Sequence, residues 1–323
     1  MMKKNSLDAF NINLDDDGVR LDKILLKKFE NLSFIKAQKL IRVGYFKVNL
    51  KRVKSNYKVK VHDLIQYNKK LILQNLNKKN KNLSEIKLKY NQKISEIKKQ
   101  IIYEDKFLLV INKPFGIPVQ GGSKIGFNID LALPFLTKDN SCLKLVHRID
   151  KDTSGILLLA KSKDIARKLT ALFRENQIKK KYLAIVIGRL NKNKGEIILP
   201  IKKKKIEGIE KMDIDYDSDH ISETSFKVLD YKKELSLLEV FPKTGRKHQI
   251  RVHLHSISTP ILGDSKYFLI SKKKKILRRK KMHLHAREII FQLNNNKYKF
   301  KASLPNYFKN TIEEYKMDYQ LNE

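Results

Sequence analysis

The sequence predicts an α+β protein in which a small N-terminal α/β domain precedes a larger domain built on a mainly antiparallel mixed sheet flanked by helices. Short apolar runs alternate irregularly with amphipathic segments, without the regular strand–helix–strand rhythm of a parallel sheet. A stretch rich in Lys, Asn and Gln separates the two regions. We therefore divide the chain into an N-terminal tail (1–19), a small domain (20–67), a linker whose second half is a solvated helix (68–100), a large domain (101–312) and a C-terminal tail (313–323).

The composition is strongly basic. The 323 residues include 70 Lys and Arg against 34 Asp and Glu, which gives a formal net charge of +36. Such a surplus is typical of proteins that bind polyanions such as RNA or DNA. Lys, Asn and Ile are all frequent and Trp is absent, so an AT-rich codon bias is an alternative source of part of the charge.

The sequence shows no pattern for a membrane span, a secretion signal or an internal disulfide. No apolar stretch approaches the roughly 18 to 20 residues that span a bilayer. The N-terminal lysines are not followed by the apolar region of a secretion signal. The single cysteine, Cys142, excludes an internal disulfide and fits a reducing compartment. We expect a cytoplasmic protein that does not engage a membrane, with a monomer as the default state.

In the small domain, apolar residues at helical spacing over 21–29 and 35–41 predict two helices, and Gly44 ends the second. Alternation over 45–65 predicts short strands. On the second helix Lys36, Lys39 and Arg42 fall within about a third of the circumference, because successive residues turn by about 100°. These three residues form a basic stripe.

The segments RLDKIL, AQKLIRVGYFKVN and HDLI resemble the S4 RNA-binding domain over nearly the whole of the small domain. The resemblance implies that the paired helices lay the basic stripe along an RNA backbone. On the residues alone, a solvated lysine-rich face on a small α/β unit is the alternative.

The large domain contains apolar runs that predict strands and two amphipathic helices. Ile165, Leu169 and Leu172 predict the first helix, and Ile250 and Leu254 predict a short second helix after the turn KTGRK. The predicted strands are FLLVIN (107–112), GILLLAK (155–161), KKKYLAIVIG (179–188), ETSFKVLDY (223–231) and LSLLEVFP (235–242).

The segment HRIDKDTSG, at 147–155, places two carboxylates at the start of a buried strand. Arg251 lies off the apolar stripe of the second helix and points toward a neighbouring element. If that neighbour is the 147–152 turn, a guanidinium there would keep a carboxylate ionised, as a nucleophile or proton acceptor requires. On the residues alone, a structural Asp150 that caps the strand remains the alternative.

Four ordered segments, IYEDKFLLVINKPFGIPV, HRIDKDTSGILLLAK, KKKYLAIVIG and TGRKHQIRVHL, resemble motifs of the Rlu-type pseudouridine synthases, which isomerise uridine in RNA. The resemblance implies that Asp150 is the catalytic aspartate and that Arg251 is its basic partner. It implies that Tyr182 packs against the flipped base and that Arg148 enters the RNA stack in its place. Leu284 would form an apolar wall of the uracil pocket.

The isomerisation needs neither external energy nor a redox change, so the resemblance implies no metal and no nucleotide cofactor. Five histidines are candidate metal ligands, at positions 248, 253, 255, 283 and 285. With one cysteine and no nearby pair of carboxylates, we predict that they pack or face RNA.

The substrate is narrowed by the segment VQGGS at 119–123, which resembles the C-type large-subunit branch of the family. Gln120 and the segment ILGDSKY depart from that branch. We expect the target to be uridines of large-subunit ribosomal RNA. The alternatives are a tRNA uridine isomerase of the same superfamily and a noncatalytic RNA-binding or ribosome assembly factor.

Overall fold

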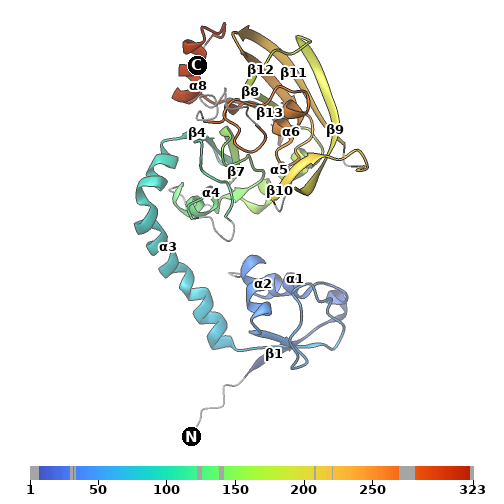
Figure 1. Ribbon diagram of the computed structural model, residues 1–323. Coiled ribbons are helices and arrows are strands. Elements are labelled where there is room, and N and C mark those ends of the chain that lie inside the picture. The colour runs from blue at the N-terminus through green and yellow to red at the C-terminus, as the bar shows by residue number, and fades with distance from the viewer. Residues whose placement is uncertain are drawn as a thin grey trace. The chain divides into compact units, whose positions relative to one another are not determined.

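The fold is taken from a computed structural model of the chain. The structure describes residues 7–29, 32, 34–121, 126–137, 142–206, 209–219, 221–268 and 281–320. The chain divides into two compact units, Met1–Lys89 and Tyr90–Glu323 (Figure 1). The division falls inside helix α3 (Lys69–Lys98), at Tyr90, whose backbone angles (φ −123°, ψ 20°) interrupt the helix.

The first unit packs two helices on a small antiparallel sheet. Helices α1 (Leu21–Lys28) and α2 (Phe34–Arg42) contribute apolar faces, as their spacing predicts. The sheet has the order β1 (Asp8–Asn11), β3 (Leu64–Tyr67), β2 (Phe46–Val48). The expected N-terminal tail thus supplies strand β1 and a short 3-10 helix, η1 (Leu14–Asp16). Pairing with β3 orders β1, which is too short to be recognised alone.

Helix α3 occupies nearly all of the segment expected to be a linker, so the segment is helical in both halves. Most of its described side chains from residue 84 onward are exposed, as expected, but a few apolar side chains are buried. Ile72 is buried in the core of the first unit. Ile94 and Ile97 are buried with Leu109 and Ile111 in the second unit. A few apolar positions on one face suffice to anchor a helix that is otherwise polar.

The second unit contains a mixed sheet of eleven strands within the described residues. Its order is β10–β9–β11–β12–β8–β13–β7–β5–β4, with β14 beside β13 and β6 beside β7. The strands are β4 (Ile101–Glu104), β5 (Leu108–Lys113), β6 (Lys144–Leu145), β7 (Ser154–Ala160), β8 (Lys179–Ile187), β9 (Lys194–Ile206), β10 (Ile209–Ile214), β11 (Ile221–Lys232), β12 (Leu235–Pro242), β13 (Leu284–Leu293) and β14 (Asn296–Lys301).

Among the strand pairs of the described residues, only β7 with β13 is parallel, so the prediction of a mainly antiparallel sheet in an α+β fold is confirmed. His285 lies opposite Ser154, and Ala286 lies opposite Gly155. Gly155 has φ +107°, and a Cβ there would collide with the backbone of Ala286. The glycine that follows the charged turn is therefore required for β13 to come this close.

Helices cover the sheet and close its core. They are α4 (Ile129–Ala132) with the 3-10 helix η2 (Leu133–Phe135), α5 (Lys163–Arg174), α6 (Gln249–Ser256) and α8 (Asn306–Glu314). Leu108 and Ile156 pack toward α5, whereas Leu109 and Leu157 pack toward α4. Strands β5 and β7 are thus buried on both faces, which explains why they appear in the sequence as continuous apolar runs.

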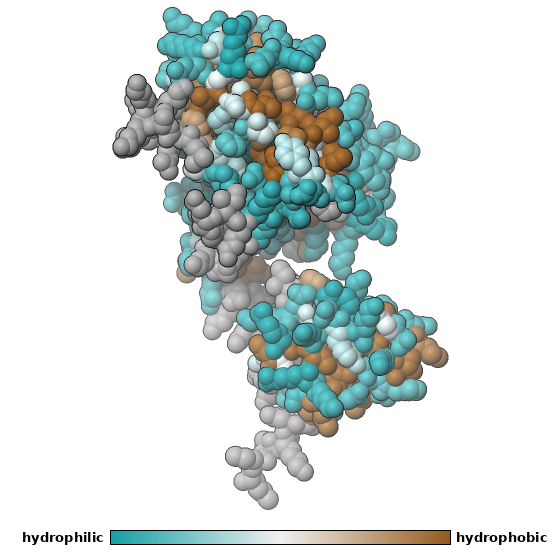
Figure 2. Space-filling model, turned by 45° about the vertical axis from the view of Figure 1, so that its right-hand side comes forward, coloured by the Kyte–Doolittle hydropathy of each residue, from teal (hydrophilic) through white to brown (hydrophobic). Residues whose placement is uncertain are grey.

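Helix α6 packs against strands β9, β10 and β11 (Figure 1). The expected C-terminal tail packs on the molecule over its described part, because Met317 is buried beside α8. No described helix is both long and apolar enough to cross a membrane. Hydrophilic residues cover most of the face in Figure 2, and apolar residues gather there in smaller areas on each unit.

Candidate active site

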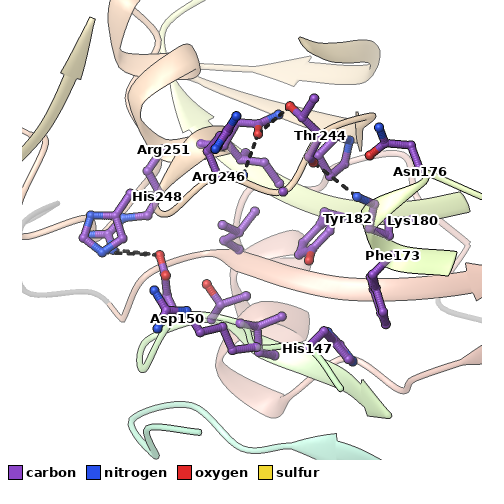
Figure 3. A pocket seen from close by; sticks show the side chains of 18 of the residues that line it. His147, Asp150, Phe173, Asn176, Lys180, Tyr182, Thr244, Arg246, His248 and Arg251 are labelled. Carbon is purple, nitrogen blue, oxygen red and sulfur yellow. Dashed lines mark hydrogen bonds and ion pairs between the residues drawn. The ribbon is translucent and has the colours of Figure 1, made fainter. Parts of the chain in front are cut away.

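The second unit contains a pocket of about 600 Å³. Its lining comes from the turn before β7, the end of α5, strand β8, the 242–248 loop, the start of α6 and the start of β13. The structure brings all five pocket residues expected from the motifs to this lining: Arg148, Asp150, Tyr182, Arg251 and Leu284. Figure 3 shows Asp150, Tyr182 and Arg251 converging from three different elements.

Asp150 and Arg251 are in direct contact. Arg251 Nη1 donates to Asp150 Oδ2 at 3.0 Å. The helical spacing did not identify the element that Arg251 faces. In the structure this element is the 147–152 turn. The side chain of Asp150 is 23% exposed and that of Arg251 is 7% exposed, so the carboxylate is open to the pocket while its partner is enclosed.

A second carboxylate fixes the guanidinium. Arg251 Nε and Nη2 donate to the two oxygens of Asp264 at 2.7 and 2.8 Å. Burial lowers the pKa of Arg251, but the hydrogen bonds and charge of Asp264, and then of Asp150, raise that pKa overall. Burial raises the pKa of Asp264, and its bonds to Arg251 bring it below the usual value. Arg251 and Asp264 are therefore both charged. Asp264 holds the guanidinium in place, so Nη1 of Arg251 points in a fixed direction, toward Asp150.

His248 also faces the carboxylate of Asp150. Its Nε2 lies 3.8 Å from Asp150 Oδ2 (Figure 3). Its Nδ1 lies 2.7 Å from the hydroxyl of Tyr267. The residue precedes α6 with φ +57°, in the left-handed region. Burial lowers the pKa of His248 to about 4, against an opposing effect of Asp150. The imidazole is therefore neutral near pH 7.

Gln249 fixes the loop that carries His248. Its Oε1 accepts from Thr244 Oγ1 (2.7 Å) and from the Arg246 N–H (2.9 Å). Its Nε2 donates to the carbonyl of Glu223 (2.8 Å) and to Thr224 Oγ1 (3.0 Å). All four hydrogen-bonding positions of this buried amide are satisfied, which gives the loop one conformation.

Tyr182 extends into the pocket from β8, where it lies opposite Val240 of β12 and Ala286 of β13. Burial, and then the charge of Asp150, raise the pKa of the Tyr182 hydroxyl, so this hydroxyl stays protonated. Lys180 lies two residues earlier on the same face, and its Nζ donates to the Thr244 carbonyl at 3.2 Å. Burial lowers the pKa of Lys180 to about 8.

The other residues of the HRID segment have distinct surroundings. His147 stacks on Phe173, and its Nε2 accepts the Leu158 N–H at 2.8 Å. Burial, and then Lys180, lower its pKa to about 3, so His147 is a neutral structural group. Arg148 is exposed at the pocket, and its side chain has no hydrogen bond or ion pair to any described residue.

Lys113, at the end of β5, anchors the turn that carries Asp150 through a hydrogen bond to the carbonyl of Lys151. Its Nζ is fully buried and donates to the carbonyls of Pro114 and Ile117 at 2.8 Å and to that of Lys151 at 3.1 Å. Burial lowers the pKa of Lys113 to about 7. The motif NKPFG therefore joins its own turn to the 150–153 turn through one side chain.

The stripe expected on the first unit lies on α2. Lys39 and Arg42 are exposed, and Lys36 is half-buried. Asp22 of α1 is fully buried and forms an ion pair with Arg20 at 2.6 Å. It also accepts a hydrogen bond from the side chain of Gln38 of α2 at 3.3 Å. This network ties the two helices together below the stripe.

Sequence reasoning missed Asp264, Tyr267 and Lys180 as members of the site, and for His248 it predicted only that the side chain packs or faces RNA. The signal for His248 was its place three residues before Arg251, one turn earlier along the chain. Asp264 and Tyr267 lie in a loop with no periodic pattern, so only the fold brings them to Arg251. In the described part of the chain, no group of three His, Cys, Asp or Glu side chains could hold a metal ion.

Comparisons with known proteins agree with this arrangement. A family model described as RNA pseudouridylate synthase matches residues 107–256, and the S4 domain model matches residues 19–65. The protein of Rickettsia typhi named ribosomal large subunit pseudouridine synthase C is 37% identical over 292 residues, which are 90% of this chain and 95% of the relative. The protein of the same name from Vibrio parahaemolyticus is 36% identical over 79% of each chain.

Among solved structures, human RNA pseudouridylate synthase domain containing 4 matches with a TM-score of 0.61 and 31% identity, over 71% of this chain and 97% of that one. The chain belongs to the RNA pseudouridylate synthase family. It is an RNA-modifying isomerase that carries an S4 domain at its N-terminal end, as the sequence motifs indicated.

Proposed function

We propose that this protein converts uridines of large-subunit ribosomal RNA to pseudouridine, with Asp150 as the catalytic residue. The observation that carries the proposal is the contact between Asp150 Oδ2 and a clamped Arg251 at a pocket large enough for a nucleoside. The relatives named for the large subunit, which match over most of the chain, support this substrate.

The target nucleotide must first leave the RNA stack, which costs a few kcal/mol. Stacking on an aromatic ring is worth about 1–3 kcal/mol per base, and Tyr182 offers such a ring inside the pocket. Leu284 supplies an apolar wall beside it. Arg148, exposed at the pocket, fills the gap that the base leaves and meets the phosphates.

The reaction then breaks the N1–C1′ bond, rotates the uracil and forms the C5–C1′ bond. C5 loses its proton and N1 gains one, so the product is an isomer. Two routes are open to Asp150, attack on C1′ or removal of the 2′ proton. Both need an ionised carboxylate, which Arg251 stabilises at 3.0 Å. The protonated Tyr182 hydroxyl adds no negative charge beside it.

Pseudouridines should be mapped in ribosomal RNA and tRNA from cells that have the protein, lack it, or carry Asp150→Asn. Loss of specific large-subunit pseudouridines in the second and third cells is the expected result. Loss only from tRNA would overturn the substrate, and full modification by Asp150→Asn would favour a noncatalytic RNA-binding factor. Asp152→Asn serves as the control, because Asp152 lies outside the pocket lining.

A further inference from the structure

A chain of polar contacts runs from strand β10 to the carboxylate of Asp150. The Met212 N–H donates to the hydroxyl oxygen of Tyr267 at 3.3 Å. That hydroxyl lies 2.7 Å from His248 Nδ1, and His248 Nε2 lies 3.8 Å from Asp150 Oδ2. His248 belongs to the pocket lining but has no part in the chemistry described above.

The chain determines which nitrogen of His248 carries the proton. Tyr267 is 1% exposed, so its hydroxyl proton needs a protein acceptor. Among the described residues, His248 Nδ1 is the acceptor within reach, since the other contact of the hydroxyl is with a donor. Tyr267 therefore donates to Nδ1. A neutral imidazole that accepts at Nδ1 carries its proton on Nε2, the nitrogen that faces Asp150.

We infer that His248 is a positioning residue whose Nε2–H, together with Arg251, holds Oδ2 of Asp150 and so presents Oδ1 to the nucleoside. Both donors approach the same oxygen, Oδ2. Oδ1 has no hydrogen bond or ion pair to any described residue. The inference rests on the proposed catalytic role of Asp150.

Two features of the site support this inference. The loop conformation that aims the imidazole is fixed by the four hydrogen bonds of Gln249. The lowered pKa of His248, about 4, keeps the ring neutral, so it acts as a directed donor and adds no second cation. The separation of 3.8 Å exceeds a hydrogen bond, and catalytic contacts of this kind shorten when the substrate binds.

Two substitutions distinguish the roles of the two ring nitrogens of His248. His248→Asn keeps an amide near the Nδ1 position, loses the Nε2 donor and tolerates the left-handed backbone. His248→Gln places an amide N–H near the Nε2 position. Single-turnover rates and RNA affinity should be measured on a transcript of large-subunit ribosomal RNA. We expect His248→Asn to lower the rate about 10- to 100-fold, as loss of a hydrogen bond to a charged group does, with RNA affinity unchanged. His248→Gln should retain most of the rate.

The matched control is His62→Asn, because His62 is an exposed histidine of the first unit with φ +71°. It makes the same exchange in the same backbone region and should leave the rate unchanged. A wild-type rate for His248→Asn, or equal losses in the Asn and Gln variants, would overturn the assignment. A wild-type protein that forms no pseudouridine on this transcript would instead count against the proposed function.

The tautomer can be read in the wild-type protein, independently of any variant's folding. Nitrogen-15 NMR of labelled histidine should show Nδ1 of His248 as an unprotonated acceptor and Nε2 as protonated. The signal is assigned by its loss in His248→Asn. A protonated Nδ1 would overturn the inference.

Discussion

Arg251 holds its position because Asp264 binds two of its nitrogens and leaves the third for Asp150. Asp264 also accepts the backbone N–H groups of Lys266 and Tyr267 at 2.9 and 3.2 Å. The guanidinium lies 5.0 Å from the centroid of the Tyr267 ring. One buried carboxylate thus orders both the loop that contains it and the cation that contacts Asp150.

Asp264→Asn should therefore reduce both stability and the rate of pseudouridine formation. Removal of one partner from a buried ion pair costs about 3–5 kcal/mol, and a released Arg251 no longer holds Asp150. Chemical denaturation gives the free energy of unfolding, and single-turnover kinetics gives the rate. The control is Asp164→Asn, since Asp164 is 53% exposed and its pair with Arg167 is worth about 0–1 kcal/mol. Equal effects of the two substitutions would contradict the clamp.

At this scale the sequence predicted the central pair and missed its surroundings. The direction of Arg251 followed from the apolar stripe of its helix, and Asp150 followed from the charged turn before a buried strand. For His248 the sequence predicted only packing or RNA contact, because its left-handed backbone lies outside the helical pattern. Asp264 and Tyr267 depend on a nonperiodic loop that folds back over α6.

At the scale of elements, helix α2 carries the basic stripe of the S4 unit. Lys39 and Arg42 project into solvent, while the buried network around Asp22 holds α2 against α1. Lysines and arginines placed in this way contact phosphates and release counterions when RNA binds. The stripe should therefore govern affinity and its salt dependence, and should leave the chemical step unaffected.

The triple variant Lys36→Gln, Lys39→Gln, Arg42→Gln tests this role. The slope of log Kobs against log salt should become shallower by about 2, because each phosphate contact contributes about 0.7–0.9. The rate at saturating RNA should be unchanged. A matched control replaces three exposed lysines on and after α3, Lys87, Lys98 and Lys99, with glutamine. A slope that falls equally in both variants would assign the effect to net charge alone.

Elements were predictable where burial was strong. Strands β5 and β7 and the second half of β8 are apolar because the sheet is covered there, and α5 has a clear apolar stripe. Strand β1 contains one large apolar residue, Phe10, and is ordered by pairing with β3. Helix α3 was obscured by its Lys and Asn content, since anchors such as Ile94 and Ile97 are few along thirty residues.

At the scale of the whole molecule, burial lowers the pKa of several basic side chains. Burial lowers the pKa of His147 and of His285 to about 3, and that of His248 to about 4. Their ordinary value is 6.5. At the basic end, burial lowers the pKa of Lys113 to about 7 and that of Lys180 to about 8, from an ordinary 10.5.

The sign of the pH dependence follows from proton binding. Between the lowered folded pKa values and the ordinary unfolded ones, the unfolded chain binds more protons than the folded chain, so the free energy of unfolding rises with pH. For the histidines this window runs from pH 6.5 downward to about 4, and stability falls as the pH falls through it. For the two lysines the window runs from about pH 7 to 10.5, and stability rises with pH.

Chemical denaturation of the wild-type protein from pH 4.5 to 9.5 should therefore give a free energy of unfolding that rises with pH, both below and above neutrality. His285→Gln should flatten the acidic limb, because the buried imidazole that accepts protons on unfolding is gone, whatever its effect on stability at pH 7. Lys113→Met should flatten the basic limb for the same reason. His62→Asn, at an exposed position, should alter neither limb. A wild-type stability that declines steadily from pH 7 to 9.5 would contradict the lowered pKa values of the two lysines.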